Sequence, residues 1–289
     1  MARPAKKEPD ATRALRDLFS RSEKRTARLP DVRRNLRRQT RVVEFPAAQL
    51  VIKGFGHAAV EMRGRELSIS DWQTQSVRDL FFLFLSQPRP LTKEQVAEQF
   101  WRELDDPAKV KLRFKNELYR LRRAVGNEII RFENNVYFFN RNSNYEFDVE
   151  AFESHLARAR SVQALEEQIE FYRQAVNLVT GPYLDDTYFD WVLADRERLD
   201  QLYLAALTAL AELYMKLAKL DEALTMCQRA IDYQPVHEVA YCLAMQAHHR
   251  RGDRAAVPRT YEACKTTLHK HLNLPPALET EALYRKPIS

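Results

Sequence analysis

The apolar pattern of this chain changes near Phe147, and this change constrains the fold more than any other feature. Before it, short apolar runs are interrupted by glycines between residues 54 and 64, which is typical of a small sheet. After it only two glycines remain, and apolar residues recur at helical spacing. The 289 residues suffice for about two domains of ~100–200 residues each. The pattern therefore predicts a multidomain protein, with an α+β domain at residues 48–146 and an all-α domain at residues 147–289.

The charge of the chain is unevenly distributed. Residues 1–49 carry 14 Lys and Arg against 6 Asp and Glu, and few large apolar residues. We predict that residues 1–47 form a flexible basic arm, which either binds nucleic acid or is only a solvated tail. Residues 50–147 carry 16 basic against 13 acidic side chains, whereas residues 148–289 carry 16 against 21. A basic front half indicates an anionic polymer as its partner.

The order of patterns in residues 48–146 predicts a winged helix-turn-helix. A glycine-interrupted apolar stretch from Leu50 predicts a small antiparallel sheet, and three helices and an apolar hairpin should follow. Local signals mark where these elements begin or end. In chain order they are Ser70-Asp71 as N-cap of the first helix, Thr92 and Gln95 as a capping box, Asp106-Pro107 and Gly126 at the two ends of the third helix, and Asn134-Asn135 as the hairpin turn.

The third helix, "KVKLRFKNELYRLRRAVG" at residues 109–126, combines an apolar stripe with seven Lys and Arg. Its apolar residues return every three or four positions, so one side should pack on a core. On roughly the opposite side, Arg113, Asn116 and Arg120 have the side chains that hydrogen-bond guanine or adenine edges in the major groove. The alternative is a solvated helix whose charges bind nothing. The apolar stripe consists of Val110, Phe114, Leu118, Leu121 and Val125, and the basic ridge of Lys109, Arg113, Asn116, Arg120 and Arg123.

Further residues around this helix are suited to the DNA backbone. Phosphate contacts supply affinity and register, whereas base contacts supply specificity. We expect the hairpin to reach the adjacent minor groove or the backbone. The complete set expected to contact double-stranded DNA is Lys109, Lys111, Arg113, Lys115, Asn116, Tyr119, Arg120, Arg122, Arg123, Arg131, Asn134 and Asn135.

The helical half of the chain shows a weak internal repeat. Its long apolar segments break near residues 219–221 and again at Gly252-Asp253, and two similar starts lie 32 positions apart. That distance is near the ~34-residue period of tetratricopeptide repeats, in which paired helices stack and form surfaces that hold other proteins. We therefore predict an all-helical, tetratricopeptide-like domain with a possible protein partner.

Several motifs together resemble one family. "YRLRRAVG" followed by an apolar hairpin is similar to the recognition helix and wing of OmpR-type winged-helix domains. The continuation "FDVEAFE", "LVTGPYLDD", Trp191, "DRERLDQLYLAALTALAE" and "LNLPPALETEALYRK" resembles the bacterial transcriptional activation domain (BTAD) that follows this winged helix in the Streptomyces antibiotic regulatory protein (SARP) family. The resemblance covers about residues 50–286.

This resemblance implies a promoter-specific transcriptional activator. It implies two protomers on direct repeats of double-stranded DNA, a homodimer on DNA, and recruitment of the RNA polymerase holoenzyme. The loop Trp101–Pro107 is the candidate polymerase contact, through Glu103, Asp105 and Asp106, although these acids serve equally well as capping and solubilising groups. We expect a cytoplasmic, nucleoid-associated protein.

The sequence offers little for an enzyme. It has no phosphate-binding glycine loop, no HExxH and no Gly-x-Ser-x-Gly, and we expect neither cofactor nor metal. No apolar run approaches the ~20 residues of a membrane span, so no membrane partner is expected. The acidic pair Asp185-Asp186 is expected to form a turn and cap. The functional alternative is a helical-repeat adaptor whose winged helix binds protein, or binds DNA nonspecifically.

Overall fold

The computed structural model describes residues 50–285, so the predicted basic arm at residues 1–47 lies outside the described part. The described chain begins with a four-stranded sheet in the order β3-β2-β1-β6. Its first three strands are antiparallel, as predicted, whereas β6 pairs in parallel with β1 and was not predicted. The strands are β1 Leu50–Lys53, β2 Ala59–Met62, β3 Arg65–Glu66 and β6 Tyr145–Phe147.

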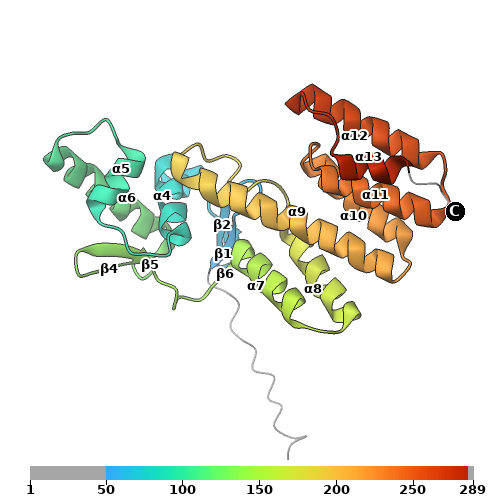
Figure 1. Ribbon diagram of the computed structural model, residues 1–289. Coiled ribbons are helices and arrows are strands. Elements are labelled where there is room, and N and C mark those ends of the chain that lie inside the picture. The colour runs from blue at the N-terminus through green and yellow to red at the C-terminus, as the bar shows by residue number, and fades with distance from the viewer. Residues whose placement is uncertain (1–49, 286–289) are drawn as a thin grey trace, which may run out of the picture. The chain divides into compact units, whose positions relative to one another are not determined.

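Four helices follow β3 in the chain, and α4 to α6 lie close to one another (Figure 1). The expected first helix is divided in two, and the predicted N-cap at Ser70-Asp71 is wrong because both residues lie inside the short α3. Instead Thr74 caps α4 by accepting a hydrogen bond from the backbone N–H of Val77 at 3.3 Å. The four helices are α3 Ile69–Trp72, α4 Gln75–Ser86, α5 Lys93–Phe100 and α6 Pro107–Val125.

The other capping and turn predictions are confirmed. Thr92 Oγ1 accepts from the Gln95 N–H at 3.2 Å, and Gln95 Oε1 accepts from the Thr92 N–H at 2.9 Å. The hairpin of β4 Ile130–Glu133 and β5 Val136–Phe139 turns at Asn134 and Asn135, whose φ angles are 52° and 64°. Asparagine tolerates this left-handed conformation better than most residues do. The expected order of sheet, helices and hairpin is therefore observed.

The second half of the described chain is helical and packs as successive antiparallel pairs (Figure 1). The predicted breaks are confirmed, because one helix ends at Lys216 and the next begins at Leu220, and Gly252 ends a later helix with φ 76°. Buried alanines such as Ala223, Ala230 and Ala247 allow close helix approach. The helices are α7 Asp148–Ser161, α8 Leu165–Leu178, α9 Leu193–Lys216, preceded by the 3-10 turn η1 Asp190–Val192, then α10 Leu220–Tyr233, α11 Glu238–Arg251, α12 Ala256–Leu272 and α13 Leu278–Arg285.

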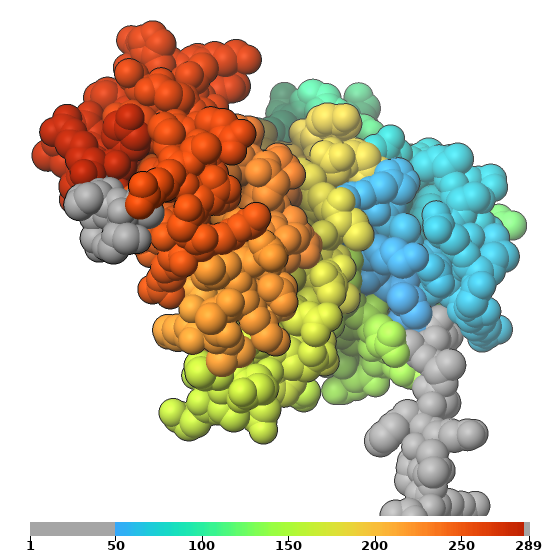
Figure 2. Space-filling model, turned by 90° about the vertical axis from the view of Figure 1, so that its right-hand side faces the viewer, coloured from blue at the N-terminus to red at the C-terminus, as the bar shows by residue number. Residues whose placement is uncertain are grey.

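The sheet is continuous with the helical region through the loop that precedes α9. In Figure 2 the blue residues of the sheet lie directly against the yellow residues of this loop and the start of α9. Leu184 N–H donates to the Gly54 carbonyl at 2.7 Å, and Phe55 and Tyr183 form an isolated β-bridge. A Cβ at Gly54 would lie 2.9 Å from the rings of Phe147 and Tyr183, so only glycine permits this close contact. None of the helices in residues 50–285 has the length and apolar character required to cross a bilayer.

Candidate nucleic-acid interface

Helix α6 is anchored at both ends and along one side. Asp106 caps its start by accepting from the Ala108 N–H at 2.8 Å, Pro107 occupies the first helical position, and Gly126 ends it with φ 100°. The predicted apolar stripe is buried, with exposed fractions from 0% to 8%. Phe114 packs edge-on against Tyr137 of the hairpin at 4.7 Å between ring centroids. The helix is therefore held rigidly, and its remaining side is presented to solvent.

The outward side of α6 is rich in cations that have few partners. Of the predicted contact residues on this helix, Arg120 and Arg122 are half-buried and the others are exposed. No hydrogen bond or ion pair among the described residues engages the side chains of Lys109, Lys111, Lys115, Asn116 or Arg123. Shallow depressions of about 390 and 440 Å³ flank the outward side. An array of unpaired cations beside open depressions can accept an extended anion.

Three predicted contact residues are already engaged within the protein. The guanidinium of Arg113 lies 5.0 Å from the centroid of the Trp101 ring and 3.7 Å from Glu103 Oε1. Arg122 donates to the Ile130 carbonyl at 2.9 Å, which ties the end of α6 to the hairpin. Arg131 pairs with Glu133 at 2.7 Å on the hairpin. Asn134 and Asn135 at the hairpin tip are exposed, so the tip is accessible.

One acidic residue of α6 is buried beside the cations. Glu117 is 6% exposed, and its Oε2 has no hydrogen-bond partner. Burial raises the pKa of Glu117, and the positive charges of Arg120 and Arg113 oppose that shift. A carboxylate in this position offsets part of the local positive charge from below the exposed surface.

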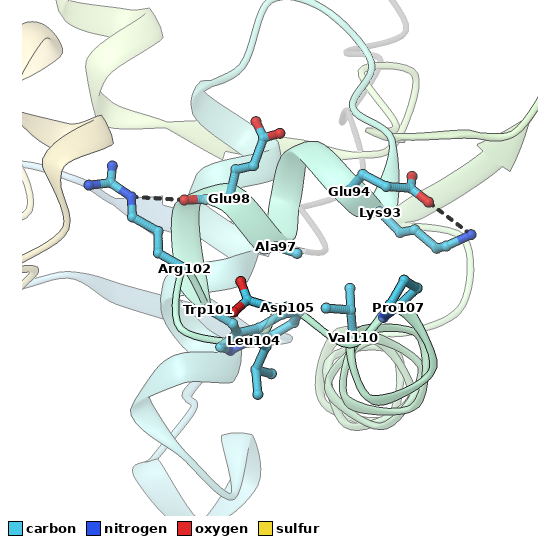
Figure 3. A pocket seen from close by; sticks show the side chains of 10 residues that line it. All are labelled: Lys93, Glu94, Ala97, Glu98, Trp101, Arg102, Leu104, Asp105, Pro107 and Val110. Atoms are coloured by element: carbon cyan, nitrogen blue, oxygen red, sulfur yellow. Dashed lines mark hydrogen bonds and ion pairs between the residues drawn. The ribbon is translucent and has the colours of Figure 1, made fainter.

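The loop Trp101–Pro107 borders a cavity of about 290 Å³ between α5 and the start of α6 (Figure 3). Glu103, Asp105 and Asp106 are exposed there, and Asp106 also caps α6. Trp101 is buried beneath the loop at 2% exposure. Arg102 forms an ion pair of 2.9 Å with Asp190, so the helical half of the chain helps to hold this loop.

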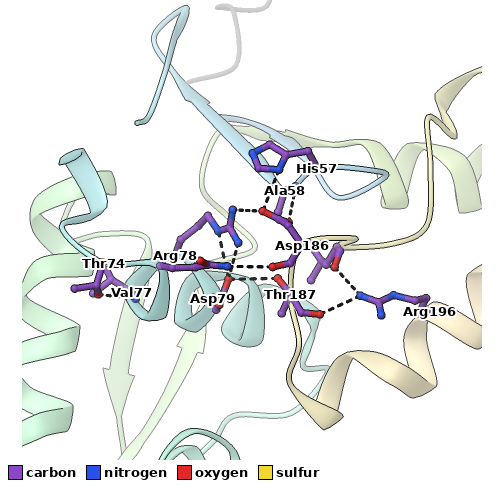
Figure 4. Close-up of polar contacts among 11 residues, drawn as sticks. His57, Ala58, Thr74, Val77, Arg78, Asp79, Asp186, Thr187 and Arg196 are labelled. Atoms are coloured by element: carbon purple, nitrogen blue, oxygen red, sulfur yellow. Dashed lines mark hydrogen bonds and ion pairs between the residues drawn. The ribbon is translucent and has the colours of Figure 1, made fainter. Parts of the chain in front are cut away.

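A polar network that the sequence did not reveal joins α4 to the loop before α9 (Figure 4). Arg78 is 7% exposed and forms ion pairs with Asp79, at 3.0 Å, and with Asp186. Thr187 Oγ1 donates to Asp79 Oδ1 at 3.3 Å. The expected turn-and-cap role of Asp186 is incomplete, because its carboxylate also accepts from the Ala58 N–H at 3.2 Å. Residues about 108 positions apart are thereby connected.

The same network fixes the loop to α9. Arg196 donates to the backbone carbonyls of Tyr183, Leu184 and Thr187 at 2.8, 2.6 and 3.2 Å. Burial raises the pKa of Asp79, and its ion pair with Arg78 opposes the shift. The loop is therefore fastened to α4 on one side and to α9 on the other. No local sequence pattern signals a contact over such a separation.

Comparisons with known proteins found a match to one family model and to solved structures. Residues 147–286 match the family model of the bacterial transcriptional activator domain. The fold is similar to that of EmbR from Mycobacterium tuberculosis, solved in complex with a low affinity phosphopeptide, with a TM-score of 0.69 and 18% identity over 84% of this chain and 67% of that chain. The yeast Sti1 TPR2B domain, solved with pHsp70, has a TM-score of 0.34 and 18% identity over 47% of this chain and 94% of that chain. No curated protein sequence matches the chain.

Proposed function

We propose that the chain, whose residues 147–286 match the bacterial transcriptional activator domain, is a transcriptional activator of the SARP type, and that residues 48–146 are its winged-helix domain for sequence-specific binding of double-stranded DNA. The observation that carries this proposal is that α6 presents unpaired cations and Asn116 to solvent on one side. Its opposite side is buried, and its N-terminus is capped. Such a helix fits the major groove, which is wide enough to admit one.

The contacts divide by chemistry. Asn116 and Arg120, with Arg113 held over Trp101, have the donors and acceptors for base edges, whereas Lys115 and Tyr119 suit phosphates. The ring of Trp101 and the carboxylate of Glu103 restrict where Arg113 can point, which favours a defined base contact over a diffuse charge. The hairpin tip would reach the neighbouring minor groove or the backbone.

The remaining parts of the proposal concern assembly on the promoter. Two protomers would bind direct repeats side by side, and the acidic loop Trp101–Pro107 would meet a basic patch of RNA polymerase. Glu103 and Asp105 are exposed in this loop, and Asp105 lines the cavity of Figure 3. The helical domain, residues 147–289, would hold a protein partner. In this proposal the protein is a regulator and catalyses no reaction.

Selection of bound duplexes from a random DNA library tests the proposal, at ~0.15 M salt so that nonspecific phosphate binding is limited. The wild type should recover a tandem direct repeat, and the Arg113→Ala/Asn116→Ala/Arg120→Ala variant should not. The double variant Arg160→Ala/Lys265→Ala also removes two positive charges, but from exposed positions on the helical domain. It should still recover the repeat. Unenriched sequence from all three proteins would contradict the proposal and favour a helical-repeat adaptor.

A further inference from the structure

Leu112 is an apolar side chain in the middle of the outward side of α6, and it is 62% exposed. Each residue advances about 100° around a helix, which places Leu112, Asn116, Tyr119 and Arg123 on the side opposite the buried stripe. Leu112 is therefore nearer the centre of the outward side than Arg113, which lies toward the edge above Trp101. Whatever enters against this side of α6 meets Leu112.

The surroundings of Leu112 are polar. It lines the depression of about 390 Å³ together with Lys109, Arg113 and Asn116. Isolated surface leucines are common, so exposure alone decides nothing. The position of Leu112 on the helix is informative, because here a leucine interrupts a series of side chains that can donate hydrogen bonds to bases and phosphates. An isobutyl group forms no hydrogen bond to either.

The major-groove edge of a base pair offers one prominent apolar group, the 5-methyl of thymine. On the basis of the proposed DNA-binding function, we propose that Leu112 determines specificity by contacting a thymine 5-methyl group in each half-site, next to the base that Asn116 reads. Burial of the methyl against Leu112 removes apolar surface of both from water, which is favourable at thymine and absent at cytosine.

Tyr119 is the other exposed apolar side chain on this side, at 67%. Its phenol hydroxyl can donate to a phosphate oxygen, so its exposure has a polar explanation that Leu112 lacks. Tyr119 lies two turns nearer the C-terminal end of α6, in the depression of about 440 Å³ with Lys115 and Arg122. This difference makes Tyr119→Ala a matched control.

The experiment replaces each thymine of the selected repeat, one at a time, by deoxyuridine, which removes only the 5-methyl group. Affinity is measured by fluorescence anisotropy with the full chain. For the wild type, one position per half-site should lose affinity about fourfold, as expected for one buried methyl group. Leu112→Ala should bind thymine and deoxyuridine equally at that position, whereas Tyr119→Ala should bind more weakly but keep the wild-type ratio.

The possible failures are distinguishable. If the wild type selects no sequence, the DNA-binding proposal itself is wrong. If it selects a repeat but no deoxyuridine position weakens binding, or if Leu112→Ala keeps the wild-type ratio at every position, the role of Leu112 is overturned while sequence-specific binding stands. Leu112 is 62% exposed, so its alanine variant should keep the wild-type circular dichroism spectrum.

Discussion

The outward side of α6 and the contact between α4 and the loop before α9 hold positive charge in opposite ways. On α6, cations such as Lys109, Lys115 and Arg123 are exposed and have no partner among residues 50–285. In the α4 contact, Arg78 is buried and meets two carboxylates, Asp79 and Asp186. A buried charge requires partners because water no longer solvates it. An exposed charge is solvated by water and stays available to bind a ligand.

The charges that hold the protein together are therefore different from those available for binding. Removal of Arg78 would leave two carboxylates without their cation inside the protein. Removal of Lys115 would leave nothing unpaired, because solvent already surrounds it. The first group should therefore affect stability and the second should affect affinity for an anionic partner.

The largest effect is expected for Arg78→Met, which keeps much of the apolar volume but removes the charge. Asp79 would remain buried, and Asp186 partly buried, without the guanidinium of Arg78, at a cost of about 3–5 kcal/mol in the free energy of unfolding. Urea denaturation followed by circular dichroism measures this loss.

The matched control is Arg251→Met, which breaks the exposed ion pair with Asp221 at 2.6 Å. Exposed pairs contribute about 0–1 kcal/mol, so this variant should unfold at nearly the wild-type urea concentration. Equal losses in the free energy of unfolding of the two variants would contradict the proposed difference between buried and exposed charges.

The elements of this fold could be predicted where local pattern determines them. The apolar stripe from Val110 to Val125 predicted both α6 and its buried side, and Asn134-Asn135 predicted the hairpin turn. Both depend on residues only a few positions apart, because helix periodicity and turn preference act locally. The capping box at Thr92 and Gln95 was predictable for the same reason.

The contacts between distant segments could not be predicted in this way. The pairing of β6 with β1 joins residues about 95 positions apart, and three residues are too few to show a strand period. Asp186 is next to a turn, and nothing local to it indicates Arg78. Leu112 carries no donor or acceptor that would mark it as a base contact, although its position on the outward side of the helix follows from the sequence.

A smaller effect, on affinity alone, is expected for Arg120→Ala. Loss of a base contact should cost about 1–3 kcal/mol on the selected repeat and relax the preference at one base position. Because Arg120 forms no ion pair among the described residues, the urea midpoint should change little. Anisotropy titrations against the repeat and against single-base variants measure both properties.

Lys115→Ala provides the contrast within α6. A lost phosphate contact should weaken binding to all duplexes alike and reduce the slope of log K against log salt by about 0.9. If Arg120→Ala and Lys115→Ala lose affinity equally on the selected repeat and on random DNA, neither residue reads a base. The distinction between reading and positioning residues on this helix would then be wrong.

Glu117 shares a property with each of the two regions, and the effect expected for its substitution is the smallest. Like Asp79 it is buried, but it has no direct ion pair, and burial raises its pKa despite Arg120 and Arg113. The folded chain therefore keeps the Glu117 proton to a higher pH than the unfolded chain, whose carboxyl titrates near ~4.3. The contribution of Glu117 to stability should decline as pH rises from that value through the folded pKa.

Glu117→Gln removes this titration, so the stability of the variant relative to the wild type should increase as pH rises from about 4 to neutral. Urea midpoints of Glu117→Gln and of the wild type at several pH values measure the trend. A difference that does not vary with pH would mean that Glu117 titrates alike in the folded and unfolded chains. In that case its carboxylate would belong with the solvated charges of α6, and burial without a partner would carry no cost at this site.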